Sequence, residues 1–337
     1  MNLRRIMSLC MMAFCLATVT IGSSLQVYAG TTPKLHGWVV YWDEHKGWAE
    51  LEDALSHEAP YESVSYFAVY FREDGSFYVP EGMEKQNAAV PIYMTVVNDV
   101  VGAKGNSLKD TAVLQQVLQN TKAQEAHSEA LISLTKRYGY DGIEIDYEQI
   151  FKEKDLIPLY TSFLRILSEK AKDNHLKLRV IVEPKMAQQI KTFPEGPTYV
   201  VMAYNLYGTH SGPGPKADMA FITKTIGDLK KMPKPWGIAF STGGAIWSDT
   251  GEKKFITTPE ALRLAKTYGA VPMRDVFSQA LSFSYRKDGV SYTVWYADEQ
   301  TVWQWMRKAE AQGIDDVSIW RLGEHEHAYT LKSIRRK

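Results

Sequence analysis

Three acidic residues stand at alternate positions of one short, largely apolar segment: Glu144, Asp146 and Glu148. If this segment is a β-strand, the three side chains share one face, while Ile143 and Ile145 point the other way. Successive acids on that face would lie only about 6.5 to 7 Å apart along the backbone. At that separation the charges repel, and burial would make at least one carboxyl group hold a proton near neutral pH. A protonated carboxyl group beside an ionised one is what acid-catalysed glycoside cleavage requires.

Alternating acids also occur on the solvated face of an antiparallel sheet, and the three residues alone do not separate the two interpretations. The surrounding sequence favours catalysis, because it indicates a buried parallel strand. A face of three carboxyl groups in such a strand is unfavourable unless function requires it.

The elements around these acids indicate a barrel. Short β-rich runs alternate with helical patterns, which is typical of βα units around a parallel sheet. In Asp155–Lys172, for example, apolar residues recur every three or four positions. Eight strands with helices between them predict a (β/α)₈ TIM barrel of the α/β class, and an open doubly wound sheet is the alternative. The candidate strands are 37–42, 64–71, 90–97, 142–148, 178–182, 199–205, 236–241 and 317–320.

A small β-hairpin insertion is expected between strands 7 and 8. Leu281–Tyr296 has a strand pattern on both sides of Asp288-Gly289, a dipeptide typical of two-residue hairpin turns. We interpret the hairpin as an insertion into the loops at the catalytic end of the barrel, not as a second domain.

Polar and aromatic residues gather at the predicted C-terminal ends of the strands, where barrels of this kind carry out their chemistry. Each one taken singly could be a loop or packing residue, but their convergence on one rim predicts a site. Among them, Tyr41, Trp42, Asn98 and Trp247 are candidate substrate contacts. The residues at strand ends are Tyr41, Trp42, Asp43, Asn98, Asp99, Asp146, Glu148, Glu183, Tyr204, Asn205, Trp247 and Trp320.

The first residues have the three parts of a secretory signal. Arg4 and Arg5 precede the largely apolar run 6–21, and Val27-Tyr28-Ala29 offers a cleavage site. We expect residues 1–29 to be a signal peptide and residues 30–337 to be the catalytic barrel, and a retained membrane anchor is the alternative. The expected location is therefore extracellular or in the cell wall.

Charge and cysteine content narrow the function classes. Cys10 and Cys15 both lie in the signal segment, so the mature chain would contain no disulfide, thiolate metal site or cysteine nucleophile. The chain has 39 basic and 39 acidic residues, so removal of Arg4 and Arg5 with the signal segment leaves a formal net charge of 37 − 39 = −2. This near neutrality gives no support for binding to nucleic acid or to an anionic membrane. No run after residue 30 is apolar for long enough to cross a bilayer.

Three segments together resemble glycoside hydrolase family 18, which includes chitinases and endo-β-N-acetylglucosaminidases. Asp141–Glu148 is similar to the family's fourth-strand sequence D-G-x-D-x-D-x-E, with Glu144 in place of one Asp. Met202–Asn205 resembles the sixth-strand M-x-Y-D, with Asn205 in place of Asp, and Ile319–Gly323 resembles the end of the eighth strand.

The order and spacing of the resemblance span most of the mature chain. Trp38–Asp43, Val97-Asn98 and Val294–Asp298 look like the bacterial branch that includes spore cortex-lytic N-acetylglucosaminidases. The third strand lacks the S-x-G-G sequence of many chitinases, which points the same way.

The resemblance implies a mechanism in which the substrate's own 2-acetamido group is the nucleophile. Glu148 would be the general acid and then the base, and Asp146 would orient the acetamido group and stabilise the oxazolinium intermediate. Tyr204 would donate its hydroxyl to the acetamido carbonyl. The remaining residues implied to support or bind the sugar are Glu144, Asp141, Asn205 and Trp320. For Trp320, a buried core tryptophan is the alternative.

No metal and no organic cofactor is expected. Glu324-His325-Glu326-His327 could offer metal ligands, but we interpret it as a solvated C-terminal loop, because no distant third ligand is identifiable. The glycine-rich segments 208–215 and 241–244 lack the lysine and the strand–loop–helix arrangement of a phosphate-binding loop.

The resemblance therefore implies a secreted hydrolase that cleaves β-1,4 bonds at N-acetylglucosamine, in peptidoglycan or chitin-like glycans. The rivals are a non-hydrolytic, lectin-like protein on the same barrel and a glycosidase that uses two enzyme carboxylates. The natural polymer, exo or endo action and the oligomeric state are left open by the sequence.

Overall fold

The computed structural model describes residues 33–324. The predicted signal segment 1–29 and residues His325–His327 of the acidic and histidine-rich loop lie outside this range.

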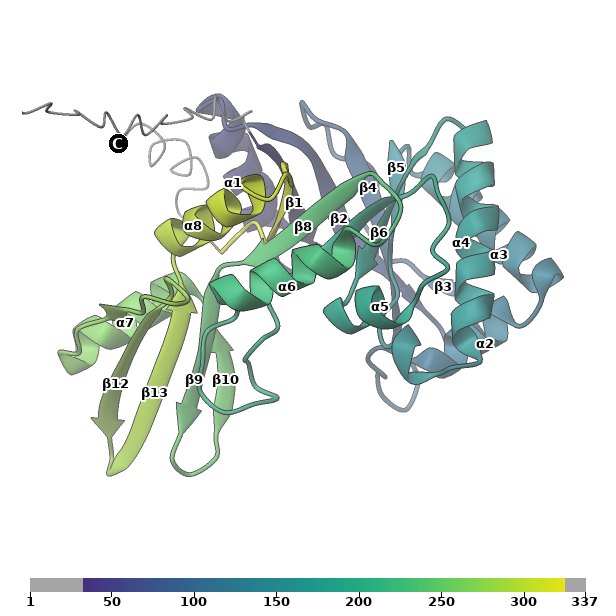
Figure 1. Cartoon of the computed structure of the whole chain (residues 1–337). Coiled ribbons are helices and arrows are strands. Elements are labelled where there is room, and N and C mark those ends of the chain that lie inside the picture. The colour runs from purple at the N-terminus through teal and green to yellow at the C-terminus, as the bar shows by residue number, and fades with distance from the viewer. Residues whose placement is uncertain (1–32, 325–337) are drawn as a thin grey trace, which may run out of the picture. The chain divides into compact units, whose positions relative to one another are not determined.

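Eight parallel strands close into a barrel, as predicted (Figure 1). β1 pairs with β14 on one side and with β2 on the other, which closes the sheet and excludes the open doubly wound alternative. The barrel strands are β1 (Lys34–Val40), β2 (Tyr61–Phe71), β4 (Ile92–Val100), β5 (Gly142–Asp146), β6 (Lys177–Val182), β7 (Thr198–Met202), β8 (Trp236–Ser241) and β14 (Asp316–Trp320).

Three strands end earlier than the sequence predicts. The strand expected to reach residue 42 ends at Val40, the one expected to reach Glu148 ends at Asp146, and the one expected to reach Asn205 ends at Met202. Beyond Asp146 the backbone leaves the sheet ladder, because the Glu148 N–H donates to the side chain of Asn98 at 2.9 Å. Glu148 and Tyr204 therefore lie in the first residues of the loops that follow β5 and β7.

Helices follow most of the barrel strands, with N-terminal caps that the sequence supplies. Asp110, Asn120 and Asp218, for example, accept backbone N–H groups at the starts of their helices. The helices of the barrel are α1 (Glu44–Ser56), α2 (Thr111–Leu118), α3 (Thr121–Arg137), α4 (Leu156–Asp173), α5 (Pro184–Gln189), α6 (Met219–Leu229) and α8 (Glu299–Glu310). The short elements are β3 (Phe77–Tyr78) and the 3₁₀ turns Tyr41–Asp43 and Ile150–Lys152.

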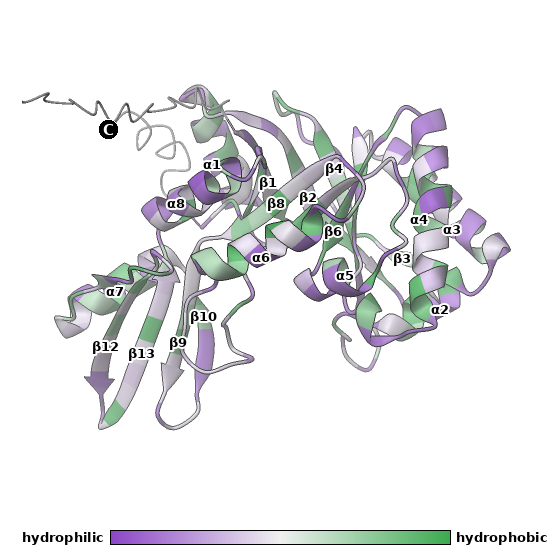
Figure 2. Cartoon of the chain, in the orientation of Figure 1, coloured by the Kyte–Doolittle hydropathy of each residue, from purple (hydrophilic) through white to green (hydrophobic). Residues whose placement is uncertain are grey.

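The main hydrophobic core lies between the barrel strands and these helices. On β5, Ile143, Ile145 and the following Tyr147 are fully buried there, as the alternation of the sequence predicts. Hydrophobic residues run along strands such as β2 and β4, while α3 and α4 show both hydrophilic and hydrophobic turns (Figure 2). Packing on this outer side of β5 fixes the other face of the strand toward the barrel interior.

The insertion between β8 and β14 is larger than the predicted hairpin. The hairpin exists as two strands of a five-stranded antiparallel sheet, ordered β10-β9-β13-β12-β11, which α7 packs against (Figure 1). Gly244 allows the close approach of β9 to β13, because a Cβ at this position would lie 1.8 Å from the Trp295 carbonyl oxygen. The inserted elements are β9 (Gly243–Ser248), β10 (Lys253–Ile256), α7 (Thr258–Tyr268), β11 (Met273–Arg274), β12 (Leu281–Lys287) and β13 (Val290–Ala297).

Within residues 33–324, no helix has the length and apolar character that crossing a membrane requires.

Candidate active site

Glu144 is fully buried inside the barrel and is surrounded by donors. Trp38 Nε1 donates to Glu144 Oε1 at 2.6 Å, and Thr95 Oγ1 donates to the same atom at 2.9 Å. Arg179 Nε donates to Oε2 at 3.0 Å, which pairs the buried carboxylate with a buried cation. The extra methylene of Glu144, relative to the family's Asp, is thus accommodated within a satisfied polar network.

The same cation affects a neighbouring histidine. His36 Nε2 lies 3.8 Å from Glu144 Oε2, but burial, and secondarily the positive charge of Arg179, lower the pKa of His36 well below its usual range. His36 is therefore neutral, and its ring contacts the hydroxyls of Ser63 and Ser65.

Asp146 follows two residues later and has a different environment. It is 8% exposed, and its Oδ1 has no hydrogen-bond partner. Burial, followed by the charges of Glu148 and Glu144, raises the pKa of Asp146 well above its ordinary value. The ionisations of Asp146 and Glu148 are coupled, because a charge on one carboxyl group disfavours a charge on the other. The pair therefore does not carry two full negative charges near neutral pH.

Glu148 lies at the mouth of the barrel, where its side chain is 15% exposed. Asn98 fixes the backbone of this residue from both sides, since its Oδ1 accepts the Glu148 N–H at 2.9 Å and its Nδ2 donates to the Glu148 carbonyl oxygen at 3.1 Å. Lys109 Nζ donates to Glu148 Oε2 at 2.5 Å.

The balance of these surroundings leaves Glu148 able to hold a proton. Burial is the largest effect on the carboxyl group, Lys109 opposes it and Glu183 adds to it, and together they raise the pKa of Glu148 to about 7. A carboxyl group with that pKa can donate a proton at mildly acidic to neutral pH.

A cavity of about 490 Å³ opens at this rim. It brings together most of the residues that the sequence predicts for the site. These are Tyr41, Trp42, Asn98, Asp146, Glu148, Tyr204, Asn205 and Trp320.

The groups that line this cavity differ in character. Burial, and then the charge of Asp146, raise the pKa of Tyr204 well above its ordinary value, so the phenol keeps its proton. Trp320 packs against Trp38 and Phe67, with ring centroids 5.8 and 5.2 Å apart, and it also lines the cavity. Trp42 is 52% exposed at the rim. The site thus combines an acid, a phenol donor and aromatic surfaces.

Three predicted site residues do not line this cavity. Asp141 precedes β5 at the opposite end of the barrel, where it pairs with Lys85 at 2.8 Å and accepts the Ile92 N–H. Glu144 lies below the cavity in the network described above. Trp247 is buried in β9, and its Nε1 donates to the carbonyl oxygens of the loop that contains residues 208 and 211.

Other residues line the cavity without having been predicted as site residues. Phe67 and Tyr70 on β2 have the strand pattern of core residues, so their types gave no signal. Asp99 was noted only as a residue at a strand end. Lys109 lies in the loop after β4, and its contact with Glu148 spans 39 residues of sequence, which no local pattern reveals.

A second cavity of about 410 Å³ shares Trp42, Tyr204, Asn205 and Trp320 with the first. Lys216 lies within it, and burial lowers the pKa of this lysine to about 8. Its Nζ donates to Ser241 Oγ at 2.7 Å and to the Thr242 carbonyl oxygen at 2.8 Å. This cavity extends the cleft toward β10 of the insertion.

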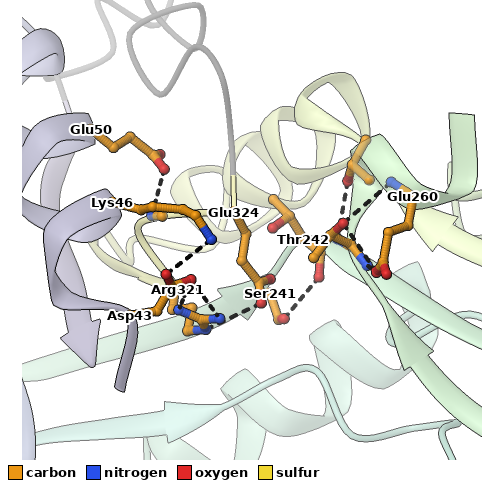
Figure 3. A network of polar contacts seen from close by, with 12 residues as sticks. Asp43, Lys46, Glu50, Ser241, Thr242, Glu260, Arg321 and Glu324 are labelled. Atoms are coloured by element: carbon orange, nitrogen blue, oxygen red, sulfur yellow. Dashed lines mark hydrogen bonds and ion pairs between the residues drawn. The ribbon is translucent and has the colours of Figure 1, made fainter. Parts of the chain in front are cut away.

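A polar network follows Trp320 along the chain (Figure 3). Arg321 lies 3.4 Å from Asp43 Oδ2 and 3.1 Å from Glu324 Oε1, and Lys46 pairs with Asp43 at 3.0 Å. These pairs join the end of β14 to the start of α1. Within residues 33–324, no group of three or more acidic, histidine or cysteine side chains could hold a metal ion.

The family model described as "Glycosyl hydrolases family 18" matches residues 100–325, which is more than half of the chain. The chain belongs to glycoside hydrolase family 18. The predicted resemblance is confirmed, and the protein is a glycoside hydrolase.

Two relatives from Bacillus subtilis are similar in sequence. An uncharacterized glycosylase, YvbX, is 26% identical over 243 residues, which are 67% of this chain and 70% of that protein. A putative sporulation-specific glycosylase, YdhD, is 24% identical over 237 residues, covering 63% of this chain and 54% of that protein. The match therefore spans about half the length of the second relative.

Solved structures of the family share the fold. The spore cortex-lytic enzyme SleL of Bacillus megaterium superposes with a TM-score of 0.73 at 17% identity, covering 91% of this chain and 74% of that one. A chitinase from Chromobacterium violaceum gives a TM-score of 0.72 at 18% identity, covering 90% and 98%. At these identities the likeness establishes the barrel.

Proposed function

We propose that the protein hydrolyses β-1,4 linkages next to N-acetylglucosamine with retention of anomeric configuration. The observation that carries this proposal is the meeting of Glu148, Asp146, Tyr204 and Trp320 on one cavity at the rim of a family 18 barrel. These residues supply a proton donor, a second carboxyl group, a phenol donor and an aromatic surface. Such groups assist an N-acetyl sugar whose own acetamido oxygen attacks its anomeric carbon.

The proposed nucleophile is the acetamido oxygen of the substrate. Glu148 donates its proton to the glycosidic oxygen as the bond from that oxygen to the anomeric carbon breaks. The acetamido oxygen bonds to the same carbon from the opposite face, which forms an oxazolinium ring. Glu148, now a carboxylate, takes a proton from a water molecule whose oxygen attacks the anomeric carbon and opens the ring. Two inversions at one carbon give net retention.

Asp146 would act on the acetamido group. Its Oδ1 is buried without a partner, so it is available to accept the acetamido N–H. That hydrogen bond would turn the acetamido oxygen toward the anomeric carbon. A positively charged ring next to Asp146 favours the ionised carboxylate, and this charge opposes the burial that raises its pKa.

Tyr204 and Asn205 would contact the same sugar from the loop after β7. The protonated phenol of Tyr204 would donate to the acetamido carbonyl, and Trp320 would form an apolar floor under the ring. Asn205 has no negative charge, but its amide can both donate and accept. We expect the departure at Asn205 to alter substrate preference or pH dependence more than turnover itself.

Peptidoglycan and chitin-like glycans are the proposed substrates, because both contain β-1,4-linked N-acetylglucosamine. The names of the similar structures, a spore cortex-lytic enzyme and a chitinase, agree with this range. We further propose that segment 1–29 directs export and that the protein acts outside the cell or in the wall. The scheme uses no metal or organic cofactor.

Hydrolysis of a chromogenic chito-oligosaccharide by the wild type and by Glu148→Gln tests the proposal. We expect the wild type to turn over and the variant to lose about 10²- to 10⁴-fold in kcat, because the proton donor is removed while the shape is kept. Glu169→Gln is the matched control, since Glu169 is exposed on α4, away from the cleft. Sugar binding by the wild type without turnover would support the lectin-like alternative instead.

A second assay tests the role of the acetamido group. Matched oligomers of glucose and N-acetylglucosamine differ in the proposed nucleophile, so only the N-acetylated oligomer should be cleaved at an appreciable rate. Equal rates on both would contradict substrate assistance and favour a mechanism with two enzyme carboxylates. Mass spectrometry of products from purified peptidoglycan and from chitin oligomers would then identify the polymer.

A further inference from the structure

The loop after β4 places a lysine directly on Glu148. Lys109 Nζ donates to Glu148 Oε2 at 2.5 Å, and both side chains line the 490 Å³ cavity. The second cavity shares Trp320, Tyr204 and Asn205 with the first but does not include Lys109. Lys109 therefore lies on the part of the cleft that does not adjoin β10 of the insertion.

The backbone of Lys109 is held firmly while its side chain reaches into the cleft. Its N–H donates to Asp99 Oδ1 at 2.7 Å, and the next residue, Asp110, donates its N–H to the Asn98 carbonyl oxygen at 2.8 Å. Lys109 has φ = 53°, a left-handed conformation that is unfavourable for a residue with a Cβ. The end of β4 thus holds both partners of the contact, because Asn98 also fixes the Glu148 backbone.

The contact and a proton on Glu148 Oε2 exclude each other. An ammonium group has three donors and no lone pair, so it cannot accept a hydrogen bond from a protonated carboxyl group. While Lys109 contacts Oε2, a proton on Glu148 can sit only on Oε1, and the neighbouring positive charge favours the ionised form. A general acid must be protonated before it can donate to a leaving oxygen.

The head group of Lys109 can leave without moving its backbone. The side chain is 36% exposed, and four rotatable carbons separate the ammonium from the fixed main chain. Leu108, which is 72% exposed, lies beside it at the same end of the cavity. A sugar on the leaving side must bring its glycosidic oxygen to the Glu148 carboxyl group, where Lys109 now stands.

We propose that Lys109 is a displaceable positioning residue, which favours the ionised form of Glu148 in the empty enzyme and leaves it when the leaving-side sugar binds. On displacement the ammonium keeps its proton, and the Glu148 carboxylate takes up one from hydronium of the bulk solvent, releasing water, before donating it to the glycosidic oxygen. The acid thereby carries its proton more fully when a substrate is present. This inference rests on the proposed role of Glu148 as general acid.

Other groups around Glu148 determine how strongly the loss of Lys109 changes the protonation of this carboxyl group. Removing Lys109 leaves an excess of acidic neighbours, which favours the protonated form of Glu148. The charged and titratable side chains that interact with Glu148, from β4 and β5 and from the residues that follow β4, β6 and β7, are Asp99, Lys109, Asp146, Glu183 and Tyr204.

The test compares pH profiles of Lys109→Met with those of the wild type on a chito-oligosaccharide. The profile of kcat/KM reports ionisations of the free enzyme, and that of kcat reports those of the substrate complex. We expect the alkaline limb of kcat/KM to move up by about one pH unit or more in Lys109→Met, because a neighbouring cation is lost. The alkaline limb of kcat should stay in place, since Lys109 has already left in the complex.

Two variants serve as controls. Lys109→Arg keeps the cation and should keep the wild-type limb of kcat/KM. Lys104→Met removes an exposed lysine from the same loop and should move neither limb. If Lys109→Met does not fold, Lys109→Gln removes the same charge with a polar side chain and carries the same expectation.

The outcomes separate this inference from the function on which it rests. An inactive wild type, or full activity in Glu148→Gln, would contradict the proposed function. If those two behave as expected but both limbs of Lys109→Met move equally, the lysine stays on the acid throughout the reaction, and displacement is wrong. If neither limb moves, Lys109 does not favour the ionised form of Glu148, and the inference is wrong.

Discussion

Glu144 and Asp146 lie two residues apart on the same face of β5, and the barrel surrounds their carboxyl groups differently. Glu144 accepts hydrogen bonds from Trp38, Thr95 and Arg179 and is paired with a buried cation. Asp146 has one oxygen without any partner and a pKa raised by burial and by its acidic neighbours. Both side chains are buried, so exposure does not account for the difference.

The comparison separates a structural carboxylate from a reactive one. Inside the barrel, the charge of Glu144 is compensated by Arg179 and by neutral donors, as buried charges in stable folds are. At the rim, Asp146 and Glu148 keep two acidic groups close together in a buried setting that disfavours their ionised forms. Such unfavourable arrangements persist where chemistry needs them, which is why strongly shifted pKa values mark functional sites.

The largest effect on stability is expected at the structural position. Glu144→Gln removes the nearest negative charge from buried Arg179 and leaves it only the more distant Asp316, at 3.8 Å, so we expect a loss of up to about 3 to 5 kcal/mol in the free energy of unfolding. Denaturant midpoints at pH 7 measure this loss. Glu144→Asp, which restores the residue of the family motif, keeps the charge and should lose less. A Glu144→Gln protein as stable as the wild type would refute the structural role.

The reverse pattern is expected at the rim. Asp146→Asn keeps the shape but removes the charge that would stabilise the oxazolinium ring, so kcat should fall by about 10²- to 10³-fold. Stability should be unchanged or higher, because a poorly compensated acid is removed from a buried position. Measuring kcat and the denaturant midpoint on the same preparation tests both halves. If Asp146→Asn kept activity near the wild-type level, or lost as much stability as Glu144→Gln, the division into a structural and a reactive carboxyl group would be wrong.

Much of the fold could be predicted from the sequence, because barrel strands are continuous apolar runs and their spacing is regular. The site was predictable as far as it lies on those strands or within two or three residues of them, as Asp146, Glu148 and Tyr204 do. Asp141 was predicted to support the site, and the structure places it five residues before Asp146, about 16 Å away along a strand. Its end of β5 is the one opposite the cavity.

The sequence is least informative about loops and insertions. Trp247 was predicted at the rim as a strand-end aromatic residue, but it belongs to β9 and is buried against the loop that contains residues 208 and 211. Lys109 was missed because its position depends on the path of the loop after β4 and on its left-handed backbone. Contacts of this kind depend on tertiary structure, and no periodicity in the sequence encodes them.

A smaller effect is expected in how stability depends on pH. The folded-state pKa of Glu148 is raised to about 7, above an unfolded value near 4.3. Between these values the folded state binds more protons than the unfolded state, so this group makes the protein less stable as pH rises toward 7.

Glu148→Gln removes that contribution. Its stability should therefore fall less than that of the wild type between pH 5 and pH 8, with a difference of the order of 1 kcal/mol. The loss of the Glu148 charge also relieves Asp146, whose raised pKa acts in the same direction. Urea unfolding at the two pH values measures the difference, and Glu169→Gln should follow the wild type. Parallel pH dependence in Glu148→Gln and the wild type would show that the rim acid has an ordinary pKa, and Glu148 would then resemble any exposed carboxylate.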